Sequence, residues 1–239
     1  MARKSKAIRA LDYFPCQAPP AALFKSRIND LRGIAHLAET HHSSEILELI
    51  KIGMTAYFEA FCKDQFGSLI SLAPSLVKNL AASGLDTSLD ASLIVDDPQE
   101  FQLQLGFHIA EKHDFGTPKK INTLFKALIR ISPFSSKVAA AYDAILHDRN
   151  LLAHHGGTFT TAYVKNAKAP HRKAAKAFQD GIVLDTTQIH KDLDLIEGVA
   201  YSIAVNTHKA LLTHLHDGCG RIGTEKKKAL EFLSWWEER

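Results

Sequence analysis

The amino-acid sequence predicts an all-α protein, and three observations support this prediction. Glycine and proline are sparse, with 13 and 8 among 239 residues, which favours long helices over a turn-rich β architecture. Apolar residues recur at helical spacing along most of the chain. Prolines stand where these periodic stretches start or end: Pro74, Pro98, Pro118 and Pro133. With 46% hydrophobic and 23% charged residues, the chain has the composition of a globular protein with a sizeable core.

The first half of the chain contains two long periodic stretches. Apolar residues at helical spacing predict a first helix over 21–40. A second helix is expected over 45–72, because two serines offer an N-cap before it and its apolar positions follow the same period. A short helical segment then reaches Leu80, and residues 86–97 are expected to form a loop.

The second half of the chain begins with three more predicted helices, each behind a capping residue: 98–110, 118–129 and 137–154. The pair Gly156-Gly157 ends the third of them. Two β-prone stretches then enclose a basic run, which predicts a small hairpin or basic loop within 158–186. Another long helix is expected over 188–216. The insertion therefore lies between the last two long helices.

We divide the chain into three parts on this basis. Residues 1–20 are expected to form an irregular basic N-terminal arm. Residues 21–217 form a single helical domain that includes the insertion. Residues 218–239 form a C-terminal helical tail with an amphipathic pattern that ends in two tryptophans.

Composition and motifs exclude several classes of protein. The formal net charge of +3 neither requires nor excludes a nucleic-acid partner. Three cysteines, far apart and outside any CxxC, argue against a disulfide framework or a cysteine zinc site, so a cytoplasmic setting is expected. No apolar run reaches the length of about 18 residues that a membrane span needs. Phosphate-loop and dinucleotide motifs are missing and the 13 histidines follow no ligand spacing, so we expect no metal and no cofactor.

The segment from His147 to Gly157 carries polar groups with a defined chemistry. On a helix, Asn150 and His154 are neighbours one turn apart, and His147 lies on the same side. The side chains of Arg149 and His154 point roughly 140° apart, a gap that a long arginine or a histidine from a second copy of the chain closes. Histidine transfers protons near neutral pH and arginine suits phosphate oxygens. This pair fits metal-independent RNA cleavage, in which the substrate 2′-OH is the nucleophile and a 2′,3′-cyclic phosphate is the product.

The stretch 149–154, R-N-L-L-A-H, resembles the Arg-(four to six residues)-His motif of the HEPN superfamily, a group of helical domains found in many RNA-cleaving toxins and defence proteins. The polar Asn150 after the arginine is typical of this motif. The double glycine behind the motif and the stretch 181–185 before the next long helix are also similar. The resemblance covers roughly residues 40–217.

The resemblance implies an up-and-down bundle of four or five helices that forms a homodimer, with the motif helices of two copies meeting in one cleft. It implies that Arg149 stabilises the scissile phosphate, that His154 is the general base or acid, and that Asn150 supports them. It also implies a toxin–antitoxin or antiphage role, with an antitoxin or defence protein as partner. The family includes members without catalysis that bind RNA, a nucleotide or a partner protein, and this is the second function expected.

A basic run follows the motif: Lys165, Lys168, His171, Arg172, Lys173 and Lys176. Together with His147, these residues are predicted to contact RNA phosphates, which makes binding salt-dependent. The alternative for this run is a solvated loop. The alternative for Arg149 and His154 is capping of the helix C-terminus, where the helix dipole favours cations.

Overall fold

The computed structural model describes residues 7–41, 43–90, 92, 98–166, 168–171, 180–218 and 222–236. These residues form helices and no sheet, so the all-α prediction is confirmed. The helices are α1 (Pro20–His41), α2 (Ser44–Leu72), α3 (Val77–Ala82), α5 (Pro98–Ala110), α6 (Pro118–Ile129), α7 (Ser136–His155), α8 (Thr161–Lys165), α9 (Thr186–Gly218) and α10 (Thr224–Leu233). Three 3-10 turns accompany them: η1 (Ala10–Tyr13), η2 (Pro15–Gln17) and η3 (Pro74–Leu76).

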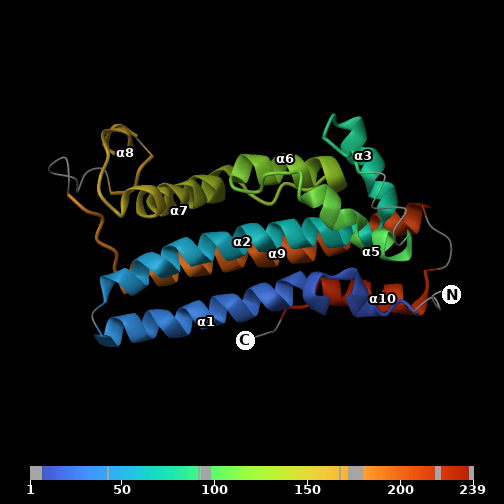
Figure 1. Ribbon diagram of the computed structural model, residues 1–239, viewed down its shortest axis with the longest axis horizontal. Helices are drawn as coiled ribbons and strands as arrows, with labels where there is room; N and C mark the ends of the chain where they lie inside the picture. The colour runs from blue at the N-terminus through green and yellow to red at the C-terminus, as the bar shows by residue number, and fades with distance from the viewer. Residues whose placement is uncertain are drawn as a thin grey trace.

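Helix α2 is the central element, and it packs against α1, α5, α7 and α9. Figure 1 shows α1, α2 and α9 side by side along the long axis, with α6 and α7 following one another above them. The six long helices predicted from the sequence are all present, with bounds that differ from expectation by at most two residues at either end. Within the described residues, no helix combines the length and the apolar character that crossing a membrane requires.

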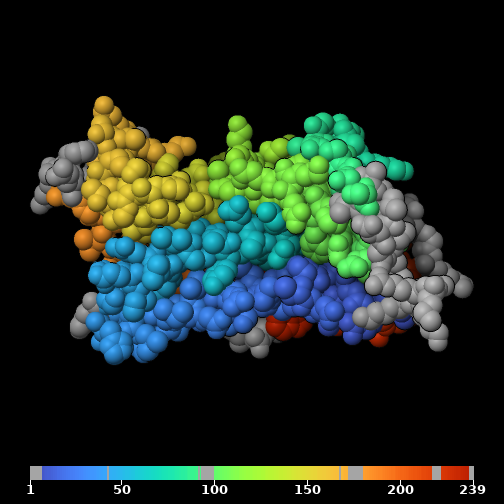
Figure 2. Space-filling view, in the orientation of Figure 1, coloured from blue at the N-terminus to red at the C-terminus, as the bar shows by residue number. Residues whose placement is uncertain are grey.

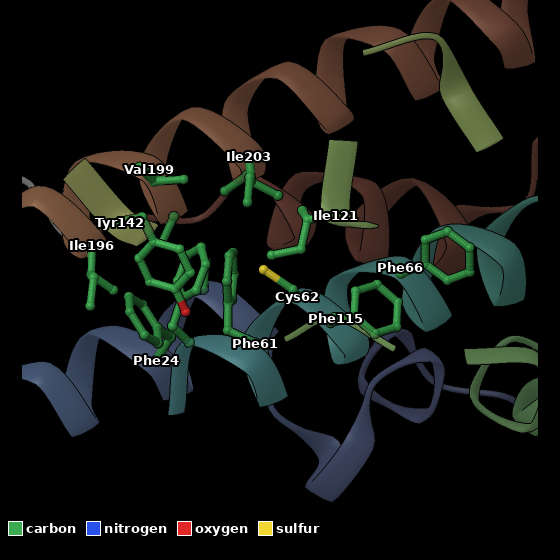
Figure 3. Close-up of a cluster of buried hydrophobic side chains, with 14 of the residues drawn as sticks. Phe24, Phe61, Cys62, Phe66, Phe115, Ile121, Tyr142, Ile196, Val199 and Ile203 are labelled. Carbon is green, nitrogen blue, oxygen red and sulfur yellow. The ribbon is translucent and has the colours of Figure 1, made fainter. Parts of the chain in front are cut away.

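An aromatic cluster fills the middle of the core. The ring of Phe58 in α2 packs against Phe24 of α1 and Tyr142 of α7, with centroid distances of 6.1 and 5.1 Å. Figure 3 shows three side chains of α9 in the same cluster: Ile196, Val199 and Ile203. Such large buried rings contribute strongly to stability. The cluster therefore holds α7 firmly against α2 and sets the direction in which the last turns of α7 point.

Helices α2 and α5 approach each other closely at two glycines. A Cβ atom placed on Gly106 would lie 1.9 Å from the carbonyl oxygen of Gly67, and one on Gly67 would lie 2.6 Å from the ring of Phe107. Beside this contact, the Ser71 hydroxyl donates a 2.7 Å hydrogen bond to the backbone carbonyl of Leu103. Only glycine leaves room for backbones this close. The pair therefore fixes the distance between α2 and α5.

The two ends of the described chain pack together. The backbone N–H of Ala10 donates to the carboxylate of Glu225 in α10 at 3.0 Å, and both Ala10 and Phe14 are buried. Helix α10, expected as a helical tail, buries Leu233 in the same core. The N-terminal arm, which we expected to be irregular, contains the two 3-10 turns η1 and η2. Residues 1–6 of the arm lie outside the described part of the chain.

Of the hairpin or basic loop predicted within 158–186, the hairpin is not confirmed among the described residues. Residues 161–165 form the short helix α8, because the Thr160 side chain accepts a hydrogen bond from the Tyr163 backbone at 3.1 Å and caps the helix. In the described part of the insertion, one antiparallel bridge forms, between Thr158 and Gly181. The β propensity of this stretch is overridden by the burial of Tyr163, whose position in α8 brings its hydroxyl to helix α7.

Asp64 in α2 is expected to make stability depend on pH. Burial raises the pKa of this carboxyl to about 6, against a smaller opposing effect of Lys63. The native state then binds the proton more tightly than the unfolded state, so stability falls as pH rises from about 4 to about 6. Asp64→Asn should remove this slope and gain about 1 kcal/mol at pH 7, less than the full shift implies because the carboxyl keeps some contact with water. Urea unfolding of the wild type and of Asp64→Asn at pH 4.5, 5.5 and 7 measures the free energy of unfolding of each. If this free energy changes with pH in the same way in both proteins, the role of Asp64 is contradicted.

Candidate active site at the end of helix α7

Helix α7 ends at a pair of left-handed glycines. Gly156 and Gly157 have φ angles of 55° and 78°, a conformation that favours glycine. Their amides donate to the carbonyls of Leu152 and Leu151 at 3.1 and 3.2 Å. The carbonyl of Gly157 then accepts a 2.9 Å bond from the amide of Ile182. The double glycine therefore ends α7 as predicted and ties this end to the chain that leads into α9.

The three motif residues lie in the last turns of α7 but face different ways. Asn150 and His154 are exposed, whereas Arg149 is half-buried and its Nε atom is buried with no hydrogen-bond partner among the residues that the structure describes. The positive charge of Arg149 acts on Tyr142, two turns back along the helix: burial raises the pKa of this phenol, and Arg149 opposes that rise. No hydrogen bond or ion pair joins Arg149 to His154 among the described residues. Within one chain the two side chains thus stand on separate sides of α7.

His147 lies on the flank of α7 that the insertion covers. The side-chain amide of Asn166 lies 3.2 Å from Nε2 of His147, which places the residues after α8 directly on this flank. His147 and His154 are seven residues apart, so their side chains point within roughly 20° of each other. Lys165 and Lys168 are exposed on the same segment. Arg172, Lys173 and Lys176 lie outside the described residues.

A buried cluster of charges behind the motif was missed in the sequence. Lys51 of α2 forms ion pairs with Asp192 of α9 and with Asp148 of α7, the latter at 3.1 Å, and all three side chains are buried. The Tyr163 hydroxyl donates to Asp148 at 2.8 Å, and Nε2 of His171 lies 3.4 Å from the same carboxylate. We call these five residues the Asp148 cluster. It joins α2, α7 and α9 to the insertion.

The groups of the Asp148 cluster shift one another's pKa values. Burial alone raises the pKa of Asp148, but the hydrogen bonds and positive charges of His171 and Lys51 outweigh it and hold the pKa below its ordinary value. Burial and the neighbouring carboxylate raise the pKa of Tyr163, so its hydroxyl stays protonated and donates. Asp148 is therefore an ionised carboxylate with fixed partners.

One signal of the cluster was present in the sequence. Lys51 stands on the apolar stripe of its helix, between Ile50 and Met54, where a charged residue requires a buried partner. Asp192 likewise interrupts the apolar stripe of α9 beside Leu193. Charges on apolar stripes thus mark residues that meet in the core, although the stripes alone do not say which of them pair.

Figure 2 shows the surface of the molecule around the end of α7. The yellow atoms of α7 and α8 lie beside the light-blue atoms at the start of α2, and together they form one end of the elongated molecule.

In the part of the chain that the structure describes, no three histidine, cysteine or acidic side chains gather in a way that could hold a metal ion. In comparisons with protein-family models, with curated proteins and with solved structures, nothing matches this chain.

Proposed function

We propose that this protein is a metal-independent endoribonuclease of HEPN type that acts as a cytoplasmic homodimer. The observation that carries the proposal is the position of the 149–154 motif: it occupies the final turns of a long helix, with His154 exposed and a glycine pair directly behind it. We further propose a toxin–antitoxin or antiphage context, with an antitoxin or defence protein as partner. This context rests on the resemblance of the motif alone.

The proposed reaction uses the groups at this helix end in distinct ways. His154 takes the proton of the RNA 2′-OH or returns one to the leaving 5′-oxygen. Arg149 stabilises the charge that develops on the phosphate, and Asn150 orients either partner. Because the side chains of Arg149 and His154 point apart within one chain, we place each Arg149 opposite His154 of a second copy. The cleft then exists only in the dimer.

The RNA strand is proposed to run over the flank of α7 that carries His147. Lys165 and Lys168 are exposed beside it and supply positive charge for the phosphates. The predicted contacts of Arg172, Lys173 and Lys176 belong to the same proposal. Binding through these side chains weakens as the salt concentration rises.

A second function is favoured by a different observation. The Nε atom of Arg149 is buried on the core side of α7, so a single chain presents no surface on which Arg149 and His154 meet. A protein that stays monomeric would therefore be a catalytically silent module that binds RNA, a nucleotide or a partner protein.

The test is cleavage of RNA by the purified protein in EDTA. We expect products with 2′,3′-cyclic phosphate ends, and a loss of at least about 100-fold in rate for His154→Ala and for Arg149→Ala. His155→Ala is the matched control, because His155 is the adjacent exposed histidine and should retain activity. Undiminished cleavage by both motif variants would overturn the assignment of these residues.

Mixing the two inactive variants tests the composite cleft. If each cleft takes Arg149 from one copy and His154 from the other, a mixed dimer of Arg149→Ala and His154→Ala contains one intact cleft and regains activity. If both residues act within one chain, the mixture stays inactive. Expression toxicity that His154→Ala relieves would support the toxin role.

A further inference from the structure

A cavity of about 450 Å³ lies between α6 and the first turns of α7, at the opposite end of α7 from the glycine pair. Figure 1 shows these two helices one after the other above α2. One face of α6 lines the cavity with Lys119, Asn122 and Lys126, which recur every three to four residues. The first two turns of α7 contribute Ser136 and Asp143. The volume lies within the range of about 300–1,000 Å³ that is typical of sites for small molecules.

The floor of the cavity is held in place by the connection between the two helices. The backbone N–H of Phe134 donates to Oδ1 of Asn122, and Nδ2 of Asn122 donates to the backbone carbonyl of Phe134, both at 2.8 Å. The Phe134 ring is 4% exposed and packs edge-on against Phe58 in the core, with a centroid distance of 6.0 Å. The cavity is therefore formed by the fold itself, before any ligand binds.

Charged side chains of opposite sign face each other across the cavity. Lys119 and Lys126 belong to the α6 wall, and Asp143 belongs to the α7 wall. Among the residues that the structure describes, none of these three side chains has a hydrogen bond or an ion pair. Lys120, the neighbour of Lys119, instead pairs with Asp114 and does not line the cavity. The charges of the two walls are thus left for a ligand.

The α6 wall suits a phosphate group. Lys119 and Lys126 are seven residues apart, so their side chains point within roughly 20° of each other and start about 10 Å apart along the helix. Both have long flexible stems, so their ammonium groups can reach an anion held between them. The hydroxyls of Ser132 and Ser136 line the same cavity, and in the described part of the chain neither has a partner. A phosphate monoester has three terminal oxygens to accept from these donors, whereas a carboxylate has two.

The α7 wall requires donors on the other part of the ligand, because the ionised carboxylate of Asp143 only accepts hydrogen bonds. We propose that this cavity binds a small phosphorylated molecule that carries hydroxyl groups, such as a sugar phosphate. Lys119 and Lys126 hold its phosphate, and Asp143 accepts hydrogen bonds from its hydroxyls. The proposal is independent of RNA cleavage, because Arg149, Asn150 and His154 do not line the cavity.

The experiment is calorimetric titration of the protein with ribose 5-phosphate, inorganic phosphate and ribose. We expect ribose 5-phosphate to bind at least about 10-fold more tightly than inorganic phosphate, and ribose not to bind. Lys119→Ala and Lys126→Ala should each weaken both phosphate ligands at least about 10-fold, because each removes one charge-assisted contact. Lys120→Ala is the matched control, since this lysine of the same helix lies outside the cavity, and it should bind like wild type.

Asp143→Ala tests the α7 wall separately. We expect this variant to bind ribose 5-phosphate no more tightly than inorganic phosphate, while its affinity for inorganic phosphate is retained. Equal affinities of the two ligands for wild type would overturn the role of Asp143 and leave only a patch that attracts anions.

Three other results would overturn the proposal as a whole. The first is a wild type that does not bind ribose 5-phosphate at millimolar concentration. The second is binding that Lys119→Ala and Lys126→Ala leave unchanged, because the ligand then lies elsewhere. The third is tighter binding of a short oligoribonucleotide that the same two substitutions weaken, because the cavity then belongs to an RNA path and not to a small molecule.

Discussion

Gly106→Ala should destabilise the protein by about 3 kcal/mol or prevent it from folding. The added Cβ would lie 1.9 Å from the carbonyl oxygen and 2.7 Å from the carbonyl carbon of Gly67. Both are backbone atoms, so no side-chain rotation relieves the clash. Helices α2 and α5 must separate instead, which loosens the buried contacts along α2. The gain of up to about 1 kcal/mol in helix propensity is too small to compensate.

Gly198→Ala in α9 is the matched control for this substitution. A Cβ on Gly198 meets no atom within 4 Å, and the residue lies in the interior of a helix. We therefore expect a gain of about 0.5–1 kcal/mol from helix propensity alone. Urea unfolding midpoints of the two variants measure the difference. Equal midpoints would show that the close approach of α2 and α5 does not limit the size of residue 106.

Lys51→Met should cost about 3–5 kcal/mol at pH 7, because it leaves Asp148 and Asp192 buried together without the ammonium that both of them share. Paired carboxylates such as Asp148, whose pKa is held low in the native state, contribute stability above their unfolded pKa and lose it as pH falls. Without Lys51 this contribution turns into a penalty at neutral pH. The deficit of the variant should therefore shrink from pH 7 to pH 4, where protonation of the carboxylates relieves their repulsion.

Lys25→Met provides the matched comparison. Lys25 is also buried and pairs with Glu197, but Arg32 holds the same carboxylate at 2.6 Å, so Glu197 keeps a positive partner. We expect a smaller loss of stability than for Lys51→Met and less dependence on pH. Guanidinium unfolding of both variants at pH 4 and pH 7 makes the comparison. A larger loss for Lys25→Met would contradict the account of the Asp148 cluster.

The long helices were predictable because period and capping agree along the chain. Thr117 caps α6 directly before Pro118, and Ser135 caps α7 directly before its apolar stripe, so both caps can be recognised in the sequence. Helix α8 was not predictable in the same way. Phe159 and Tyr163 are four residues apart, so their rings would share one side of the chain in a strand and also in a helix. The apolar pattern therefore did not decide between a strand and a helix for this stretch.

The candidate site was predictable only in part, for a physical reason. A local motif shows which residues share one helix, and so Arg149, Asn150 and His154 could be named. The partners of Asp148 come from α2, from α8 and from the segment behind α8, and Lys51 lies 141 residues from its other partner, Asp192. Their pairing depends on how α2, α7 and α9 pack, which no local pattern contains. His171 was counted among the basic residues of the insertion for the same reason.

The packing of the first elements against the last ones has a consequence for synthesis on the ribosome. Ala10 bonds to Glu225, and Lys25 lies 5.7 Å from the ring of Trp236 as well as against Glu197. Helix α1 can pack against α2 as soon as α2 has been translated, but its partners in α9 and Trp236 follow much later, so part of its buried face stays uncovered until then. The nascent chain already carries the 149–154 motif before Asp192 has been translated. A protein built in this way completes this part of its fold only after residues 225–236 have been translated.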